Sequence, residues 1–300
     1  EYSDLAINRQ ILNKISCSTS IIDMEKGVNK ITKRRMDSHK GDYGHVLIIG
    51  GDTGYGGAAI LASKAALKSG SGLVTLATKP EHLSPALSQC PELMVKAVNS
   101  GQDLEDHLKE PTLIVIGPGL GTTAWSEQLL QRTLWEAKKR NIPVVMDADA
   151  LNLLTTLKFD TPLPKKLVIT PHPGEASRLL NKSTKEIEID RFRAVKELEN
   201  KFSAVCVLKG SGSLVCYKKN NFQQISVCES GNPGMASGGM GDVLSGLIGS
   251  FIAQGLKLHE ATETAVDMHA KVADLVALER GELGLVASDV LEGISDLLRS

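Results

Sequence analysis

Short apolar runs recur along most of the chain, and several of them are separated by stretches with helical spacing. Apolar runs without polar alternation are typical of strands buried on both faces, as in a parallel sheet. The pattern therefore predicts an α/β fold, with a mostly parallel central sheet and helices on both faces. The expected strands are Val46–Ile49, Leu73–Ala77, Leu113–Ile116, Val144–Met146, Leu167–Ile169, Ala204–Leu208 and Leu214–Tyr217.

Apolar residues at helical spacing predict helices between the strands and a succession of helices near the C-terminus. There is no internal repeat and no low-complexity segment. One α/β domain from about residue 39 to 300 is therefore the simplest prediction. The expected helices are Ala58–Lys68, Ser126–Lys139, Ser183–Asn200, Gly241–Gln254, Leu258–Arg280 and Ser288–Leu298.

Residues 1–38 have a different pattern. They contain one moderately amphipathic stretch, Leu5–Ile15, and a polar run that ends in the basic cluster Lys33–Arg35. Because runs of charge are usually solvated, we interpret residues 1–38 as an N-terminal extension or linker. Three basic residues without aromatic neighbours are weak evidence for a nucleic-acid-binding arm.

Charge and cysteine content narrow the class of function. The 34 Lys and Arg residues are offset by 35 Asp and Glu residues, so we expect neither a nucleic-acid nor a membrane partner. No apolar run is long enough for a membrane span, and no signal-peptide pattern opens the chain. The five cysteines form no C-x-x-C pair, so we expect a cytoplasmic protein without disulfides. The first residue is not Met, which leaves a missing upstream domain open.

Four of the expected strands are followed by loops rich in glycine, proline or charge. In a parallel sheet with helices on both faces, ligands bind beyond the carboxyl ends of the strands. The sequence therefore predicts one site built from several loops at this edge of the sheet. The loops are Gly50–Gly57, Gly117–Gly121, Asp147–Asp149 and Pro171–Glu175.

Two common nucleotide-binding motifs do not fit the chain. Gly54-x-Gly56-x-x-Ala59 matches the dinucleotide-binding pattern, but four residues separate Ile49 from Gly54 and no acidic residue ends the second strand. The sequence G-x-x-x-x-G-K-[ST] is absent. We expect instead that these glycines let substrate lie against the backbone at a helix N-terminus, although a purely structural turn stays open.

A glycine-rich loop over residues 231–242 runs directly into an apolar helix. Successive N–H groups at a helix N-terminus, together with the helix dipole, attract anions. The loop therefore predicts an anion hole around Gly238–Gly241. Asp242 lies in the first turn, and the alternative that it merely N-caps the helix stays open.

Other candidate residues lie in turns and at strand ends. Lys209–Ser213 predicts a hairpin turn that would also contact a nucleotide beside the anion hole. His172 stands between two prolines, in a stiff loop at the predicted edge, and we expect it to contact substrate. Three roles stay open for Asp147 and Asp149: they bind a metal ion, they bind a substrate hydroxyl, or they cap the helix that follows. Two interpretations of His269 stay open: it packs in the core, or it supports a residue of the site.

Seven motifs occur together and in order, and they closely resemble those of the NAD(P)H-hydrate dehydratases of the ribokinase-like superfamily. The match covers residues 39–300 and leaves residues 1–38 outside. The resemblance implies a ribokinase-like fold. The motifs are His39–Gly44, Gly50–Gly57, Gly117–Gly121, Asp147–Asn152, Thr170–Glu175, Leu208–Gly212 and Asn232–Asp242.

The resemblance implies an activity in the repair of damaged cofactors. Members of the family dehydrate hydrated NADH or NADPH by passing a phosphoryl group to the C6 hydroxyl, after which phosphate leaves. Asn232–Ala236 resembles the ADP-using form, so the implied reaction converts ADP and (6S)-NAD(P)H hydrate to AMP, phosphate and NAD(P)H. ATP is the second choice of nucleotide, and Mg²⁺ is expected with it.

The resemblance also implies roles for single residues. Asp242 would be the base for the hydroxyl, and the anion hole would bind the transferring phosphoryl group. The positions expected to contact the hydrate are Ala58, Gly119, His172 and Asp242. Those expected to contact the nucleotide are Lys209, Gly210, Ser211, Gly212, Ser213 and Gly241, and those of the anion hole are Gly238, Gly239, Met240 and Gly241.

Two alternative functions stay open. A different kinase of this fold, such as a hydroxyethylthiazole or sugar kinase, would share the Gly-Asp anion hole but not the His172 loop. A nucleotide-binding sensor or assembly subunit would bind without turnover, although an intact Asp242 argues against it. The resemblance further implies a homo-oligomer and an epimerase partner domain or protein.

Overall fold

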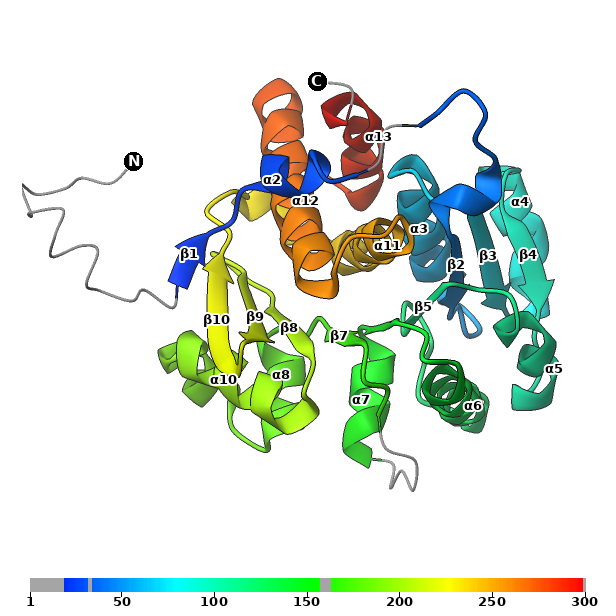
Figure 1. Cartoon of the computed structure of the whole chain (residues 1–300), viewed down its shortest axis with the longest axis horizontal. Coiled ribbons are helices and arrows are strands. Elements are labelled where there is room, and N and C mark those ends of the chain that lie inside the picture. The colour runs from blue at the N-terminus through cyan, green and yellow to red at the C-terminus, as the bar shows by residue number, and fades with distance from the viewer. Residues whose placement is uncertain (1–18, 32–33, 157–162, 299–300) are drawn as a thin grey trace, which may run out of the picture.

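A ten-stranded sheet lies between two layers of helices in the computed structural model, which describes residues 19–31, 34–156 and 163–298 (Figure 1). The strand order is β1-β10-β9-β8-β7-β6-β5-β2-β3-β4. Neighbouring strands are parallel except where β9 pairs with β8 and with β10. The predicted fold class, a mostly parallel sheet with helices on both faces, is confirmed. The strands are β1 (Thr19–Ile21), β2 (His45–Ile49), β3 (Leu73–Thr78), β4 (Met94–Ala97), β5 (Leu113–Ile116), β6 (Val144–Met146), β7 (Leu167–Ile169), β8 (Val205–Leu208), β9 (Leu214–Lys219) and β10 (Phe222–Val227).

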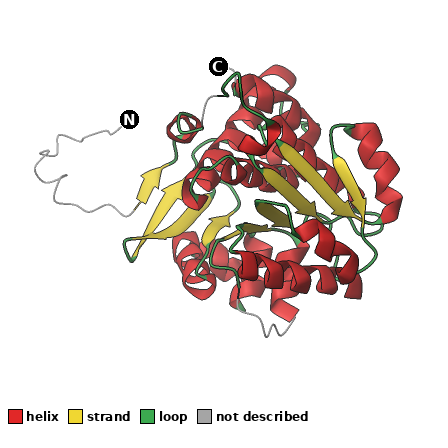
Figure 2. Ribbon diagram, turned by 45° about the vertical axis from the view of Figure 1, so that its right-hand side comes forward, coloured by secondary structure: helices red, strands yellow, loops and turns green. Residues whose placement is uncertain are grey.

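Helices cover both faces of the sheet, as Figure 2 shows. Short 3-10 helices occur at Lys40–Tyr43, Pro80–His82, Asp106–Leu108 and Pro233–Met235. The α-helices are α2 (Met24–Val28), α3 (Gly56–Lys68), α4 (Leu83–Gln89), α5 (Gly101–Glu105), α6 (Ala124–Arg140), α7 (Asp149–Thr156), α8 (Pro173–Leu180), α9 (Thr184–Ile189), α10 (Arg191–Phe202), α11 (Met240–Ala253), α12 (Leu258–Arg280) and α13 (Ala287–Leu297).

The central strands are continuously apolar because each one serves two separate cores. In β2, Val46 and Ile48 join the core that also contains side chains of α3, α11, α12 and α13. Leu47 and Ile49 point to the other face and join the core formed with α6, α7, α8 and α10. All four side chains are fully buried. A strand with one solvated face would instead alternate apolar and polar residues.

One predicted helix, Ser183–Asn200, is wrong, whereas the other expected strands and helices are confirmed within a few residues. Two helices, α9 and α10, occupy this stretch and meet at Asp190. Asp190 has φ −140° and ψ 79°, outside the helical region, and its carboxylate accepts a hydrogen bond of 2.9 Å from the Arg193 N–H. Asp190 therefore ends one amphipathic helix and caps the next, which leaves the hydrophobic periodicity almost unchanged.

Part of the segment predicted as an extension packs onto the sheet. Strand β1 pairs in parallel with β10, and the Met24 N–H donates a hydrogen bond of 3.0 Å to Asp267 Oδ2 on α12. Residues 19–31 therefore contact the domain, while the boundary at residue 39 stays a prediction. The amphipathic stretch Leu5–Ile15 and Lys33 of the basic cluster lie outside the described residues.

The described cysteines are free and buried, and Cys17 lies outside the described residues. Burial raises the pKa of the Cys216 and Cys228 thiols to about 12, so they pack as apolar groups. Among the described helices, none combines the length and the apolar composition that crossing a bilayer requires.

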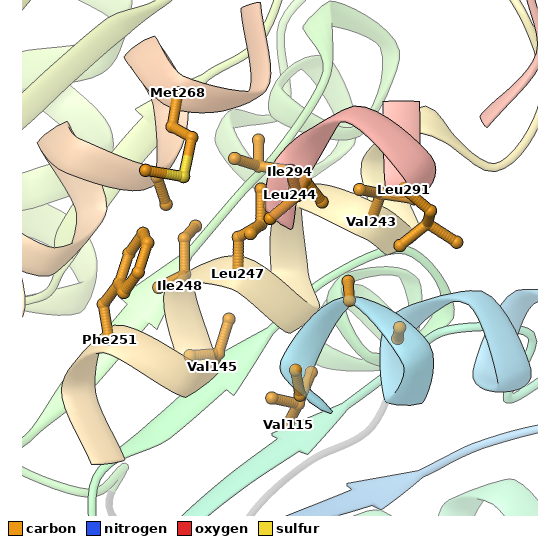
Figure 3. Close-up of a cluster of buried hydrophobic side chains, with 14 of the residues drawn as sticks. Val115, Val145, Val243, Leu244, Leu247, Ile248, Phe251, Met268, Leu291 and Ile294 are labelled. Atoms are coloured by element: carbon orange, nitrogen blue, oxygen red, sulfur yellow. The ribbon is translucent and has the colours of Figure 1, made fainter. Parts of the chain in front are cut away.

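Helix α11 packs closely on both α3 and the sheet, and this packing places its N-terminus at the sheet edge. Gly246 faces the backbone of α3, where an added Cβ would overlap the Ala62 carbonyl oxygen. Figure 3 shows the α11 side chains, from Val243 to Phe251, among residues of β5, β6, α12 and α13. Because Gly246 has no side chain, the two helices approach to backbone contact.

We expect Gly246→Ala to lower the free energy of unfolding by roughly 1–3 kcal/mol, because α11 must move away from α3. This loss outweighs the better helix propensity of Ala. Gly57→Ala in α3 is the matched control, since an added Cβ there meets no atom within 4 Å. Urea unfolding measures both variants, and equal stability of the two would contradict the close approach.

Candidate active site

The loops predicted to form one site do lie on one edge of the sheet. Strands β8, β7, β6, β5 and β2 are parallel neighbours, so their carboxyl ends open onto the same edge. Residues 50–57 follow β2, residues 117–121 follow β5 and residues 147–149 follow β6. Residues 171–175 follow β7, and the 209–213 turn follows β8. The predicted common edge is therefore confirmed.

Two of these loops contact each other at the N-terminus of α3. Gly119, whose φ of 57° lies in the left-handed region, packs so closely on Tyr55 that an added Cβ would overlap the Tyr55 carbonyl oxygen. The same Cβ would lie 3.2 Å from the Ala58 Cβ. The structure thus brings together Ala58 and Gly119, both expected to contact the hydrate, beside the open N–H groups of a helix N-terminus.

The N-terminus of α11 presents a second group of open donors. Gly239 is the N-cap, with φ 91°, and Met240 is the first helical residue. Within the described residues, no N–H group from Gly238 to Gly241 donates a hydrogen bond. Such N–H groups, together with the helix dipole, favour a bound anion. The geometry is that expected of the anion hole, whose occupancy stays a prediction.

An ion pair between a buried aspartate and a largely buried lysine joins β6 and β8 at the centre of this edge. Lys209 Nζ lies 2.7 Å from Asp147 Oδ1 and 3.8 Å from Glu175 Oε2. Ser245 Oγ, on α11, donates a hydrogen bond of 2.6 Å to Asp147 Oδ2. A Cβ added at Gly241 would lie 3.2 Å from Lys209 Nζ. The Lys209 side chain therefore points to the N-terminus of α11, where the anion hole is predicted.

The charges of this pair are maintained in spite of its burial. Burial alone would raise the pKa of Asp147, but the Lys209 ammonium and the hydrogen bonds from Lys209, Ser245 and Thr170 hold it below its ordinary value. Burial alone would lower the pKa of Lys209. The negative charges of Asp147 and Glu175 have the larger effect, so the pKa of Lys209 is above its ordinary value. Lys209 is therefore a fixed positive charge at neutral pH.

Asp242 is a carboxylate with no hydrogen-bond donor among the described residues. Burial, and then the charge of Asp147, raise its pKa to about 7, although Lys209 acts in the opposite direction. The interpretation of Asp242 as an N-cap is wrong, because Gly239 is the N-cap and Asp242 is the third residue of the helix. A carboxylate that titrates near neutral pH is suited to accept a proton from a substrate.

His172 has a contact at each ring nitrogen, and its ring is half-exposed. It is the N-cap of α8, and its Nδ1 accepts a hydrogen bond of 3.0 Å from the Gly174 N–H. Burial, then the charges of Lys209 and Arg178, lower its pKa, so the imidazole is neutral at pH 7. Because Nδ1 is an acceptor, the proton is on Nε2, which lies 3.5 Å from Glu175 Oε1 on the half-exposed ring. Contact between this ring and substrate stays a prediction.

The predicted hairpin turn is confirmed. Strands β8 and β9 are antiparallel and are joined by Lys209–Ser213. Within the described residues, the N–H groups of Gly210, Ser211, Gly212 and Ser213 donate no hydrogen bond. The turn therefore presents a row of donors next to Lys209.

The two aspartates that follow β6 have different partners. Asp147 carries the ion pair, whereas Asp149 accepts hydrogen bonds from the Gly121 N–H at 2.9 Å and from Asn152 Nδ2 at 3.2 Å. In the described part of the chain, no group of three His, Cys, Asp or Glu residues lies close enough to hold a metal ion alone. A Mg²⁺ ion carried by nucleotide phosphates needs only one or two carboxylates, and Asp149 fits that smaller requirement.

The sequence reasoning missed Ser245 as a site residue. Ser245 follows Gly241 by four residues, so the two share one face of α11, and this spacing was the signal that would have found it. His269, left open in the sequence, is buried, and its Nε2 has no partner in the described structure. Burial, and then the charge of Lys209, lower its pKa to about 4, so it is neutral.

The sheet order and the glycine-rich N-terminus of α11 define a ribokinase-like α/β protein. A model of the NAD(P)H-hydrate dehydratase family matches residues 46–296. The chain belongs to this family.

Three relatives illustrate the similarity. The bifunctional NAD(P)H-hydrate repair enzyme Nnr of Coxiella burnetii is 44% identical, over 95% of this chain and 57% of its own length. The ADP-dependent (S)-NAD(P)H-hydrate dehydratase of Staphylococcus aureus is 37% identical, over 82% of this chain and 86% of its own length. The crystal structure of the ADP/ATP-dependent NAD(P)H-hydrate dehydratase of Bacillus subtilis, co-crystallised with ATP/Mg²⁺, is 26% identical, with a TM-score of 0.79 over 93% of this chain and 98% of that one.

The chain spans little more than half the length of the bifunctional relative, whereas it spans most of the Staphylococcus aureus dehydratase. The similarity therefore covers one part of the longer enzyme and nearly all of the shorter one.

We expect Asp242→Asn to raise the free energy of unfolding at pH 8 by at least ~1 kcal/mol. The folded pKa of Asp242, about 7, lies above the value of an unfolded aspartate. Deprotonation therefore costs more in the folded state. The group lowers the stability of the fold increasingly between about pH 4 and pH 7, and the effect levels off above pH 7. The gain from the substitution should shrink as the pH falls from about 7 toward about 4, where the unfolded aspartate also begins to be protonated.

The matched control is Asp289→Asn. Asp289 is also the third residue of its helix, α13, but its carboxylate is bonded to the Val286 N–H and to Arg280. Its substitution should lower stability at pH 8. Thermal melting from pH 4 to pH 8 measures both variants, and a loss of stability in Asp242→Asn at pH 8 would contradict the raised pKa of this partly buried, unpartnered carboxylate.

Proposed function

We propose that this chain dehydrates hydrated NADH and NADPH at the expense of ADP. The observation that carries the proposal is Asp242, a partly buried carboxylate without a hydrogen-bond donor in the described structure, at the glycine-rich N-terminus of α11. The names of the relatives support the same reaction. The alternatives of another kinase or of a sensor have no comparable support.

The hydrate would lie between the loops after β2, β5 and β7. A flat ring would lie against the backbone at Ala58 and Gly119, because neither residue carries a side chain beyond Cβ. His172 would donate a hydrogen bond from its neutral ring, and Asp242 would receive the proton of the C6 hydroxyl. These four positions come from four loops or helix starts that share the carboxyl edge of the sheet.

The nucleotide would lie over the 209–213 turn and the N-terminus of α11. The turn and the residues from Gly238 to Gly241 offer N–H groups that have no other partner among the described residues. Lys209 adds a fixed positive charge next to Gly241. Phosphate oxygens are the ligands that such donors and such a charge bind best.

The proposed reaction balances in two steps. In the first, the C6 hydroxyl loses its proton to Asp242, its oxygen bonds to the terminal phosphorus of ADP, and the bond to AMP breaks. In the second, phosphate leaves C6 with the C–O electron pair, a proton leaves the adjacent carbon, and the ring double bond forms again. A hydroxyl is a poor leaving group and a phosphate a good one, so nucleotide cleavage drives the dehydration.

Mg²⁺ would enter with the nucleotide and neutralise part of the phosphate charge, held on the protein side by Asp149. Its presence with ATP in the Bacillus subtilis structure supports this expectation. We further propose that a second activity, expected to be an epimerase, works beside this chain, since the longer relatives are named bifunctional. The homo-oligomeric state and the cytoplasmic location stay predictions.

The test incubates the purified chain with hydrated NADH and either ADP or ATP. Reduced-nicotinamide absorbance should return, with one AMP released for each NADH when ADP is used, and the initial rate with ADP should at least equal that with ATP. Asp242→Asn should reduce turnover roughly 10²–10⁴-fold, the usual contribution of a positioned general base.

Nucleotide cleavage that needs no hydrate, or that follows another alcohol, would replace this proposal with a kinase. Binding of ADP without any turnover in the presence of hydrate would favour the sensor. A clear preference for ATP would overturn the choice of ADP alone.

A further inference from the structure

Arg191, the first residue of α10, lies directly behind the 209–213 turn. Its Nη2 donates a hydrogen bond of 3.2 Å to the Leu208 carbonyl oxygen, and its Nη1 donates to the Ser211 carbonyl oxygen. A Cβ added at Gly210 would lie 3.1 Å from Nη2. The guanidinium therefore occupies the place that a side chain at Gly210 would fill.

In the described structure, hydrogen bonds of the 209–213 turn are made by carbonyl oxygens and not by the N–H groups of residues 210–213. Besides the two carbonyls bonded to Arg191, the Gly210 carbonyl accepts a bond of 3.1 Å from Ser213 Oγ, and the Ser213 carbonyl accepts one of 2.9 Å from the Cys228 N–H. The N–H groups of residues 210–213 donate to no described group. Four carbonyls from Leu208 to Ser213 are thus bonded, whereas the N–H groups of residues 210–213 are open, and a turn with such open N–H groups forms an anion-binding concavity.

The contacts of Arg191 indicate a role beyond stabilising α10. Its Nε is buried and has no hydrogen-bond partner in the described structure. An unsatisfied buried donor lowers the stability of the folded state, so burying the guanidinium at this position is unfavourable for folding. The planar guanidinium reaches the two carbonyls with two different nitrogens. A lysine at this position would have to bond both carbonyls with a single ammonium group.

We propose that Arg191 is a positioning residue of the nucleotide site. It acts through the turn: by bonding the Leu208 and Ser211 carbonyls from behind, it turns these oxygens away from the phosphates and leaves the N–H groups facing them. The inference rests on the proposed function, because it assumes that ADP binds over the turn. The hydrogen bonds of Arg191 in the described structure go to the turn and not to Asp242.

The experiment compares Arg191→Met with Lys201→Met in the full chain. Lys201 is the matched control, since it lies on the same helix and its ammonium donates to a backbone carbonyl, that of Leu179, away from the turn. Calorimetry gives the Kd for ADP, steady-state rates give kcat and the two KM values, and melting gives the stability. Arg191→Lys serves as the milder variant in case Arg191→Met does not fold.

We expect Arg191→Met to raise the Kd and the KM for ADP at least 10-fold, with the KM for the hydrate and the kcat at saturating ADP changed less than 3-fold. Arg191→Lys should recover part of the ADP affinity, and Lys201→Met should bind ADP normally. Normal ADP affinity in a folded Arg191→Met or Arg191→Lys would overturn the inference alone. An equal loss in Lys201→Met would also overturn it. A wild-type chain that does not bind ADP would overturn the proposed function and the inference with it.

Discussion

The buried ion pair between Lys209 and Asp147 is the interaction on which the site depends. It joins the ends of β6 and β8, and Ser245 and Glu175 extend it to α11 and α8. Taking two charges out of water is costly, so such a pair contributes little net stability. Removing one partner is far more harmful, because it leaves the other charge buried and unpaired. The pair therefore fixes the relative positions of four elements, and its main value is geometric and electrostatic.

The neighbouring groups take their properties from this pair. The negative charge of Asp147 adds to burial in raising the pKa of Asp242, and Lys209 limits the rise, so that the carboxylate titrates near pH 7. The charge of Lys209 also adds to burial in keeping His172 neutral. One ion pair thus sets the protonation of the proposed base, Asp242, and of the proposed hydrogen-bond donor, His172. The same pair supplies the fixed positive charge for phosphate, that of Lys209. This supports the view of the edge as a single site with two halves.

The sequence predicted those features that a local pattern encodes. Continuous apolar runs indicated the central strands, and the glycine and proline residues after them indicated the edge where the loops meet. The break at Asp190 was not predicted, because a polar residue between two amphipathic helices hardly changes the hydrophobic periodicity. Ser245 and Arg191 were missed for a different reason. Their partners, Asp147 and the 208–211 backbone, are set by the tertiary fold, and the only local signal was the four-residue spacing of Ser245 from Gly241.

The central claim is that the ion pair holds Asp242 ready to act as a base near neutral pH. The most direct test is the pH dependence of the single-turnover rate of NADH formation, in wild type and in Asp147→Asn. The wild-type rate should rise with pH around a midpoint near 7, because only the deprotonated carboxylate accepts the proton. Asp147→Asn removes a negative charge that raises the pKa of Asp242, so its midpoint should move to lower pH. A wild-type rate that is already maximal at pH 5, or a midpoint that does not move in Asp147→Asn, would contradict the account.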